Sequence, residues 1–495
     1  MRSRIDISVF LLLLFILFLF SILGVSPRIH QVDIEMRNAR LAVSSGEFII
    51  ASQRIANAAG HLPWRIDLWE RAGRYSLQGD DPQMAILYLE RALEMSQENG
   101  FSMQYEISSQ GLMDLGDAYQ QIGDTGTAIQ TWQLLLSREG YSRELIENLV
   151  QAYVSLGDYT SAISLLQGVV ALEPKDAQFQ YRLGLFTATQ NPEESLDSLD
   201  KALQLDRTLE MKVSDLRRAI LSARYAQDLA FSLLVTGRAL ASIDEWQLAA
   251  EAFRQATLLR PSYAEAWAYL GEAYQTLNYQ MNTPVSYNKN NNDGLNELEK
   301  ALELDPNSLS AHLFLSLYWK RHMEFDLALD LIRSAISKIP SNPILQVELA
   351  NLLAASGDLD SANDAYLRAI SLRPYDPIYK KYLIEFSLEY DYQVEEIALP
   401  VARQLTIGSA HEPAALDLMA EVLIHQGDLS TAERFLRRAL EEDINYASAH
   451  LHLGLVYIML EKFQNAYEEL TLVVSLAPDS DIANQAQRLL VTYFP

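Results

Sequence analysis

The chain has 495 residues, of which 49% are hydrophobic, and its 39 basic and 65 acidic residues give a formal net charge of −26. A negative field of this size repels the phosphates of DNA and RNA, so we expect no nucleic-acid partner. The sequence contains no cysteine. This excludes disulfide frameworks, thiolate metal sites, iron–sulfur clusters and cysteine nucleophiles.

The amino-terminal region contains one long apolar segment. Residues Ile7 to Pro27 are all uncharged, and Val9 to Phe20 consists only of Val, Phe, Leu and Ile. As a helix, this segment would span roughly 31 Å, the thickness of a bilayer core. We predict a single transmembrane signal anchor at residues 7–27. A cleaved signal peptide is the alternative, but Pro27 is a poor residue beside a cleavage site.

The charges on either side of this segment bear on its orientation. Arg2 and Arg4 precede it, and three arginines follow it, so the count is nearly even. A short tail with two arginines before the first apolar helix is typical of a cytoplasmic amino terminus, and long downstream domains cross largely regardless of charge. We therefore expect residues 1–6 to form a short cytoplasmic tail. The rest of this single-pass protein of the cell membrane would then be extracytoplasmic.

Beyond Ile29 the sequence shows pairs of amphipathic helices. Trp267, Leu270, Gly271 and Tyr274 are spaced at i, i+3, i+4 and i+7, so they form one stripe of a helix. A glycine or aspartate commonly follows the first helix of a pair, and a proline often follows the second.

The second helix has its own signature. Ala249, Phe253, Ala256 and Pro261 give a small residue, a large residue, a second small residue and a stop. Joined to the first-helix signature, these spacings match the W-x2-L-G-x2-Y…A-x3-F…A…P pattern. The chain therefore resembles the tetratricopeptide repeat (TPR) family. The resemblance implies an all-α fold, a right-handed superhelix of helix-turn-helix repeats, here preceded by the transmembrane helix.

The pattern returns about every 34 residues through the rest of the chain. We predict about twelve TPR-like repeats in residues 28–479 and a carboxy-terminal capping helix in 480–495. The repeat at about 377–412 is degraded. The predicted starts lie near residues 32, 66, 109, 143, 177, 230, 264, 309, 343, 377, 413 and 447.

Three segments interrupt the period. Residues 100–108 are an insertion, and Leu216–Leu229 reads as a helix outside the register. Residues 279–293 replace a tight turn with an Asn-rich segment. Such a polar segment has little apolar surface to bury, so we interpret it as a tolerated surface loop.

The resemblance also implies where a ligand would bind. In such a superhelix the first helices line the concave side, and stacked repeats offer an extended surface there. Both signs of charge occur at the outward positions of these helices, which favours a protein or peptide segment over a polyanion. The candidate groove residues are Arg40, Arg74, Asp117, Gln121, Gln151, Arg238, Glu272, Lys320, Arg321, Asn351, Glu385, Glu421 and His425.

One known binding mode of the family finds little support. Some members hold a terminal carboxylate in a clamp of Lys, Asn and Arg from successive repeats. Asn351 matches one position of this clamp, but the neighbouring positions hold the apolar residues Val347 and Leu313. A carboxylate-clamp role is therefore in doubt.

No catalytic motif is present. The sequence lacks the phosphate-binding, dinucleotide-binding, nucleophile-elbow and zinc-protease motifs. His312 and His450 occupy the Trp position of the repeat, where packing is the expected role. His450 and His452 are two residues apart on one helix and face different sides, so they would not bind a metal together. We expect no enzyme activity, no cofactor and no metal.

These observations predict a non-enzymatic, membrane-anchored scaffold that binds protein partners through its groove. An accessory component of an envelope polysaccharide or glycan assembly machinery is the alternative, which aromatic groove residues would favour. A hydrolase or transferase would need a pair of carboxylates with raised pKa that the pattern does not reveal.

Overall fold

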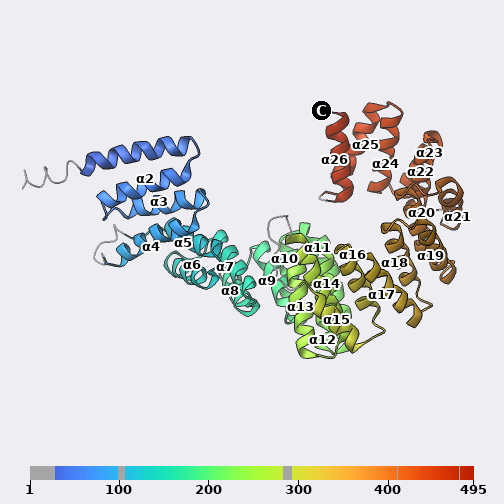
Figure 1. Ribbon diagram of the computed structural model, residues 1–495, viewed down its shortest axis with the longest axis horizontal. Coiled ribbons are helices and arrows are strands. Elements are labelled where there is room, and N and C mark those ends of the chain that lie inside the picture. The colour runs from blue at the N-terminus through green and yellow to red at the C-terminus, as the bar shows by residue number, and fades with distance from the viewer. Residues whose placement is uncertain (1–27, 99–105, 282–292, 410, 479, 495) are drawn as a thin grey trace, which may run out of the picture. The chain divides into compact units, whose positions relative to one another are not determined.

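The computed structural model describes residues 28–98, 106–281, 293–409, 411–478 and 480–494 (Figure 1). The predicted anchor at residues 7–27 lies outside these ranges. Within them, every helix is too short or too polar to cross a bilayer. The chain divides into an N-terminal unit, residues 1–222, and a C-terminal unit, residues 223–495. Each unit is described by itself.

The N-terminal unit is a row of antiparallel helix pairs (Figure 1). A helix at residues 28–44 precedes the labelled ones. The pairs that follow are all α-helical, and adjacent helices in the chain pack against each other. Their bounds are α2 (Phe48–His61), α3 (Ile66–Gln78), α4 (Pro82–Glu98), α5 (Ser109–Gln121), α6 (Thr125–Glu139), α7 (Arg143–Ser155), α8 (Tyr159–Leu172), α9 (Ala177–Ala188) and α10 (Pro192–Leu205).

The C-terminal unit repeats the arrangement and ends in a single helix, α26 (Asp481–Tyr493). Regular structure in the described residues of both units is helical throughout, so each unit is an α-solenoid. The right-handed sense of the superhelix stays a prediction. The paired helices are α12 (Leu229–Ser242), α13 (Trp246–Leu259), α14 (Ala264–Met281), α15 (Leu295–Leu304), α16 (Leu309–Arg321), α17 (Phe325–Lys338), α18 (Pro343–Ala355), α19 (Leu359–Leu372), α20 (Pro377–Glu389), α21 (Leu399–Gly408), α22 (Pro413–His425), α23 (Leu429–Glu442), α24 (Ala447–Met459) and α25 (Phe463–Leu476).

A Gly-Asp dipeptide makes the turn inside several pairs. The glycine takes a left-handed conformation, with φ between 72° and 89°, which ends the first helix at little steric cost. The aspartate then caps the second helix, because its carboxylate accepts the backbone N–H three residues later. These turns are at Gly123-Asp124, Gly157-Asp158, Gly357-Asp358 and Gly427-Asp428.

Other pairs make the same turn without glycine. Asp80, Asp244 and Asp391 are left-handed at this point, and aspartate tolerates the conformation. Met323 and Glu461 adopt it as well, with φ of 63° and 58°. A left-handed conformation costs such residues about 1–2 kcal/mol each. Packing of the flanking helices therefore imposes this turn even where the local sequence opposes it.

Small residues let the two helices of a pair approach closely. A Cβ added to Gly116 would lie 2.1 Å from Nε1 of Trp132, whose ring packs on the backbone of α5. Gly237 receives the ring of Phe253 in the same way, with its nearest carbon 2.5 Å from such a Cβ. These glycines occupy the Gly position of the repeat, and the large residue comes from the second helix.

Two features around the predicted Asn-rich loop are described. Helix α14 continues to Met281, past the point where we expected the loop to begin. The chain is next described from residue 293, and Gly294 has a φ of 87°. A Cβ there would lie 2.1 Å from the carbonyl oxygen of Gly271, so only glycine fits this close return to α14. Residues 282–292 lie outside the described ranges, as do 99–105 of the first insertion.

The out-of-register helix was predicted with the wrong bounds. Helix α11 runs over Glu210–Ala223 and not over Leu216–Leu229. Gln227 is left-handed, and the Asp228 carboxylate accepts the N–H of Phe231 to begin α12. The apolar pattern of the sequence joined the end of one helix to the start of the next across this break.

The degraded repeat has an irregular second helix. A single π-turn, η4 (Val394–Ala398), leads into α21, and the N–H of Leu399 bonds to the carbonyl oxygen of Val394. Pro400 follows and has no N–H to give to a regular helical bond. The π-turn pairs residues five apart instead of four, so the residues after it do not keep the regular spacing of the repeat.

Candidate protein-binding groove

First helices of neighbouring pairs contact one another in both units. In the N-terminal unit α3 contacts α5, and in the C-terminal unit the contacts run from α12 through α14, α16, α18, α20 and α22 to α24. Side chains on the face shared by two such helices can therefore interact across repeats. Most of the predicted groove residues lie on these helices.

In the N-terminal unit, Arg74 is engaged by the next first helix. Its Nε donates to Oδ2 of Asp114 at 2.8 Å, and Nε2 of Gln110 donates to Oδ1 of the same carboxylate at 2.9 Å. Asp114 is buried. The guanidinium of Arg74 is thus held in place and its charge is balanced within the protein.

Asp117 lies one turn further along α5, and its surroundings are less favourable for an ionised carboxylate. Nδ2 of Asn148 donates to its Oδ1 at 3.1 Å. Burial, with the negative charges of Asp114 and Glu144, raises the pKa of Asp117 to about 6. At neutral pH this carboxylate is mostly ionised and lacks a cationic partner of its own among the groups that shift its pKa. A hydrogen-bond donor or cation from a ligand would be stabilised there.

Two adjoining cavities define the N-terminal groove. One, of about 550 Å³, is bounded by α3 and α5, and the other, of about 220 Å³, by α5, α6 and α7. Asp117 and Gln121 line both cavities, so the surface is continuous over these helices. The full lining is Arg74, Leu77, Gln78, Gln110, Asp114, Asp117, Gln120, Gln121, Trp132, Asn148, Gln151 and Ala152.

This groove gathers four predicted residues, Arg74, Asp117, Gln121 and Gln151. Half of its lining is carboxamide side chains, each of which offers both donors and acceptors. Two of its polar atoms, Oε1 of Gln120 and Nε1 of Trp132, are buried with no hydrogen-bond partner in the described part of the chain. The groove can therefore make many hydrogen bonds of either polarity.

In the C-terminal unit, Glu272 and Arg321 form a bridge between α14 and α16. Nη2 of Arg321 lies 3.5 Å from Oε1 of Glu272, and its Nη1 donates to Oε1 of Gln275 at 3.1 Å. Burial raises the pKa of Glu272, and Arg321 opposes the shift. The guanidinium also lies over the ring of Tyr279, 5.7 Å from its centroid.

Lys320 and Asn351 lie near a carboxylate that was not predicted, Glu348 on α18. Ser316 Oγ donates to Glu348 Oε1 at 3.1 Å, and burial raises the pKa of this carboxyl while Ser316 and Lys320 oppose the shift. Asn351 accepts a 2.6 Å hydrogen bond from the hydroxyl of Tyr366. Asn351 is thus tied to the second helix of its own pair.

Two other predicted residues have different surroundings. Arg40 is exposed on the helix at residues 28–44. The guanidinium of Arg238 lies over the ring of Tyr269, 5.1 Å from its centroid, and so links α12 to α14. Arg40 is not among the residues that line the two cavities of the N-terminal groove.

Glu385 and His425 each contact a titratable neighbour at the surface. Glu385 lies 3.4 Å from Nζ of Lys381, one turn away on α20. Nε2 of His425 lies 3.2 Å from Oδ1 of Asp391, in the turn after α20. Exposed pairs of this kind contribute little to stability.

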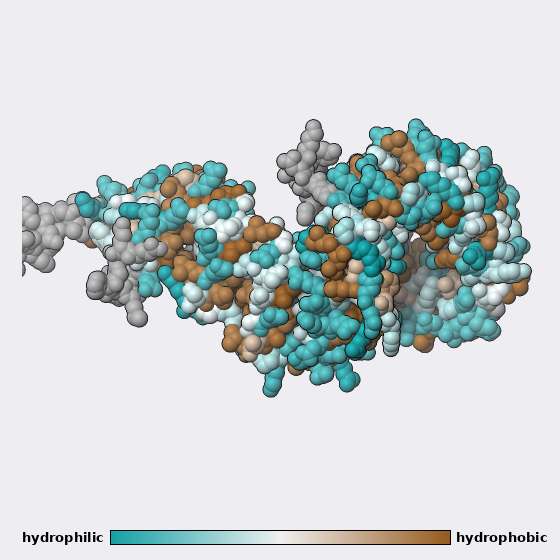
Figure 2. Space-filling view, turned by 90° about the horizontal axis from the view of Figure 1, so that it is seen from below, coloured by the Kyte–Doolittle hydropathy of each residue, from teal (hydrophilic) through white to brown (hydrophobic). Residues whose placement is uncertain are grey.

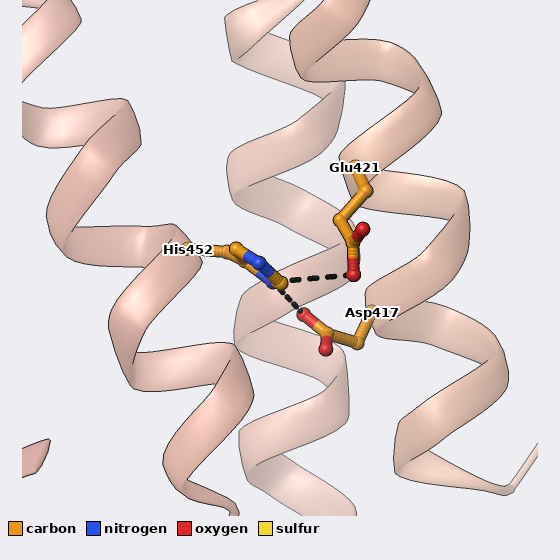
Figure 3. A group of neighbouring side chains, drawn as sticks. All are labelled: Asp417, Glu421 and His452. Carbon is orange, nitrogen blue, oxygen red and sulfur yellow. Dashed lines mark hydrogen bonds and ion pairs between the residues drawn. The ribbon is translucent and has the colours of Figure 1, made fainter. Parts of the chain in front are cut away.

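Glu421 belongs to a three-residue cluster shown in Figure 3, with Asp417 on the same helix and His452 on α24. His452 Nδ1 lies 2.7 Å from Asp417 Oδ1 and 3.6 Å from Glu421 Oε1. Burial and the charge of Asp417 raise the pKa of Glu421 to about 7, although His452 opposes the shift. Burial opposes protonation of His452, but the Asp417 carboxylate outweighs it and raises the pKa of His452.

Asp417 and His452 were not predicted as site residues. The two histidines of α24 do face different ways as expected, since His450 bonds to Ile444 and Glu469. The signal that could have found the cluster is the four-residue spacing of Asp417 and Glu421, with a histidine one repeat later. His312 is buried, and its Nδ1 lies 2.7 Å from the carbonyl oxygen of Ser308.

Comparison with protein families identifies part of these helix pairs. A model of the tetratricopeptide repeat matches residues 148–209, 234–277 and 320–377, and a second one matches residues 447–480. The chain carries tetratricopeptide repeats. The matched segments of this TPR chain lie in both units. A search of curated protein sequences finds no significant match.

Solved structures similar to this TPR chain include three with 14–20% sequence identity. Yeast Tom70 is 14% identical with a TM-score of 0.35, over 78% of this chain and 95% of that one. Cut9-Hcn1 of the APC/C hetero-tetramer is 14% identical with a TM-score of 0.35, over 94% and 99%. Pseudomonas aeruginosa pilF is 20% identical with a TM-score of 0.32, over 46% and 97%.

On the face shown in Figure 2, apolar residues lie scattered among hydrophilic ones over both units. Single exposed apolar side chains such as Met211 and Ile407 are normal on protein surfaces and need no ligand to explain them. The polar groove over α3, α5 and α7 is therefore a better candidate for specific binding than these exposed apolar positions.

Proposed function

We propose that the chain is a non-enzymatic, membrane-anchored TPR scaffold that binds protein or peptide partners, with the N-terminal groove as a principal binding site. The observation that carries this proposal is the continuous polar lining of that groove over three successive first helices. Repeat arrays use such extended surfaces for binding.

The chemistry of the groove suits an extended peptide. A peptide main chain alternates N–H donors with C=O acceptors, and carboxamides pair with both. The carboxamides in the lining, of which Gln121 and Gln151 are exposed, supply such partners along its length. Asp114 and Asp117 exceed the single charge of Arg74, so a basic side chain in the bound segment would be favoured.

Site-specific photo-crosslinking tests the groove. A photoreactive amino acid at Gln121 or Gln151 should capture the same partner proteins, because both positions line one surface. The matched control is Arg138, an exposed residue of α6 outside the groove lining. Adding Asp117→Arg should abolish capture from both groove positions. Equal capture from Arg138, or capture that persists with Asp117→Arg, would contradict the proposal.

We further propose that residues 7–27 anchor the chain and that its TPR part lies outside the cytoplasm. The support is the length and apolarity of the segment and the short basic tail before it. Because the chain has no cysteine, a thiol introduced by Arg138→Cys is the only group of this chain that a membrane-impermeant maleimide can label. Labelling in intact cells is expected. Labelling only after permeabilisation would reject this orientation but would not contradict the proposed binding groove.

A further inference from the structure

We infer that Asp417, Glu421 and His452 form a binding site for a divalent transition-metal ion of the Zn²⁺ type. One ligand atom from each residue can be chosen so that all three atoms lie within 4.8 Å of one another. Two carboxylates and one imidazole are donors that such ions accept. This inference is independent of the proposed protein-binding function.

The helices bring the three side chains together. Asp417 and Glu421 are four residues apart on α22, so they lie on the same face one turn apart. His452 comes from α24, which contacts α22 directly. Figure 3 shows its ring reaching toward both carboxylates from the neighbouring helix. The site thus draws on the first helices of two successive pairs.

The distances between donors suit a small ion. Ligand atoms placed tetrahedrally around Zn²⁺ at its usual bond lengths lie about 3.3 Å apart. The observed separations of His452 Nδ1 are 2.7 Å to Asp417 Oδ1 and 3.6 Å to Glu421 Oε1, which bracket that value. The two carboxylate donors lie within 4.8 Å of each other, so side-chain rotations could bring all three donors around one ion.

The cluster contains more acidic than basic side chains, which favours binding of a dication. The cluster places two carboxyl groups against a single imidazole. The nearest charged groups on α20 are Glu385 and Lys381, which lie 3.4 Å apart and offset each other. Glu421 has His452 as its ion-pair partner, at the longer of the two distances. Two ionised carboxylates and a neutral imidazole would balance the charge of M²⁺, with any protons of the cluster released on binding.

A supporting hydrogen bond orients one of the donors. Ser448 Oγ on α24 donates to Asp417 Oδ2 at 2.7 Å, which leaves Oδ1 directed at His452. Such second contacts fix ligating carboxylates in metal sites and raise affinity. Asp417 is only 2% exposed, whereas Glu421 and His452 are half-buried, so one side of the site is open to solvent. Water can complete the coordination from that side.

The donor set also predicts selectivity. Ca²⁺ and Mg²⁺ prefer six or more oxygen ligands, whereas an imidazole nitrogen suits Zn²⁺ and Co²⁺. A bound ion would join α22 to α24 and slow their local opening, since binding to the folded state alone stabilises it.

Calorimetric titration of the full chain in detergent, without a polyhistidine tag and after chelator treatment, tests the inference. With ZnCl2 we expect one site per chain that binds at least tenfold more weakly in His452→Gln and in Glu421→Gln. These positions are chosen because a change at buried Asp417 would risk the fold. The matched control is His411→Gln, an exposed histidine that also pairs with a glutamate, and it should bind like the natural chain.

Two further readouts distinguish this site from chance binding to a chain of net charge −26. Zn²⁺ should slow hydrogen exchange in α22 and α24 of the natural chain and of His411→Gln, but not of the two site variants. Co²⁺ should give a visible absorption band that both site variants lose. Equal affinity in the site variants, or equal binding of Ca²⁺ and Zn²⁺ at one site, would overturn the inference.

Discussion

Substituting Gly116 by alanine should destabilise the α5–α6 pair because of one contact. The new Cβ would lie 2.1 Å from Nε1 of Trp132 and 2.5 Å from two of its ring carbons, where ordinary contact is about 3.5–4 Å. The Trp132 ring is 2% exposed and packs within the apolar cluster of α5–α7, so any shift away from Gly116 would disturb these contacts even where the ring borders the groove. Overpacking of this kind costs about 2–3 kcal/mol at the upper end of its usual range.

A gain in helix propensity offsets part of this cost. Alanine is favoured over glycine inside a helix by about 0.8–1 kcal/mol, so the net loss should be about 1–2 kcal/mol. Gly168 in α8 is the matched control, because it is an exposed helical glycine and its added Cβ would meet nothing within 4 Å. Gly168→Ala should therefore stabilise α8 by up to about 1 kcal/mol.

Local hydrogen exchange is the suitable assay, because long repeat arrays do not unfold in a single two-state step. Each loss of about 1.4 kcal/mol in local stability raises the exchange rate by about a factor of ten. Amides of α5 and α6 should therefore exchange roughly 5–30 times faster in Gly116→Ala. Amides of α8 should exchange up to about fivefold more slowly in Gly168→Ala. Unchanged or slower exchange in α5 and α6 of Gly116→Ala would refute the packing argument.

Three further predictions use the same local assay. Burial and nearby carboxylates raise the pKa of Asp117 from 3.8 to about 6, so its ionisation destabilises the fold as pH rises through that interval. After allowance for partial exposure, Asp117→Asn should stabilise α5 and α7 by about 1–2 kcal/mol at pH 8 and leave their stability unchanged at pH 4. An effect of the same size at both pH values would contradict this assignment. Asp428→Ala removes the N-cap of α23, which should cost about 1 kcal/mol of local stability and speed amide exchange in the first turn by about fivefold. Equal exchange rates in the two proteins would mean that the cap contributes nothing. Met323→Gly relieves a left-handed conformation and should stabilise α16–α17 by up to about 1 kcal/mol, whereas faster exchange would show that the Met323 side chain matters more.

The repeat architecture could be predicted because its steric rule recurs. Ala162, Ala362 and Ala432 occupy the same position in different pairs, and all three are fully buried where two helices cross. A larger side chain would separate the helices, so the small residue returns with the period. The all-helical TPR solenoid predicted from this recurrence is confirmed.

Single boundaries were harder to predict, because local patterns compete there. The apolar residues near Leu216 continue toward α12, but a 3-10 turn at Arg224–Ala226 and the backbone at Gln227 and Asp228 separate the two helices. The turn at Met323 carries no glycine, so the sequence gives no sign of its left-handed backbone. Tertiary packing decides both features, and the sequence pattern reports it only indirectly.

The partners of the candidate groove residues could not be predicted, since they depend on rotamers and on how neighbouring first helices align. Asp114 lies 40 residues after Arg74, and His452 lies 35 residues after Asp417, yet each pair is within hydrogen-bond distance. The repeat period brings these positions near one another. It does not specify which of the several polar side chains on facing helices will meet.

These internal pairs change which residues can give the groove its specificity. Arg74 and Arg321 already contact carboxylates within the chain, so a ligand that took either guanidinium would leave a partly buried carboxylate without its partner. Loss of such a partner costs more than an exposed ion pair gains. No described cation shifts the pKa of Asp117, and Gln121 and Gln151 are exposed beside it. The polar groups around Asp117, rather than the paired guanidiniums of Arg74 and Arg321, are therefore where a partner can gain binding energy.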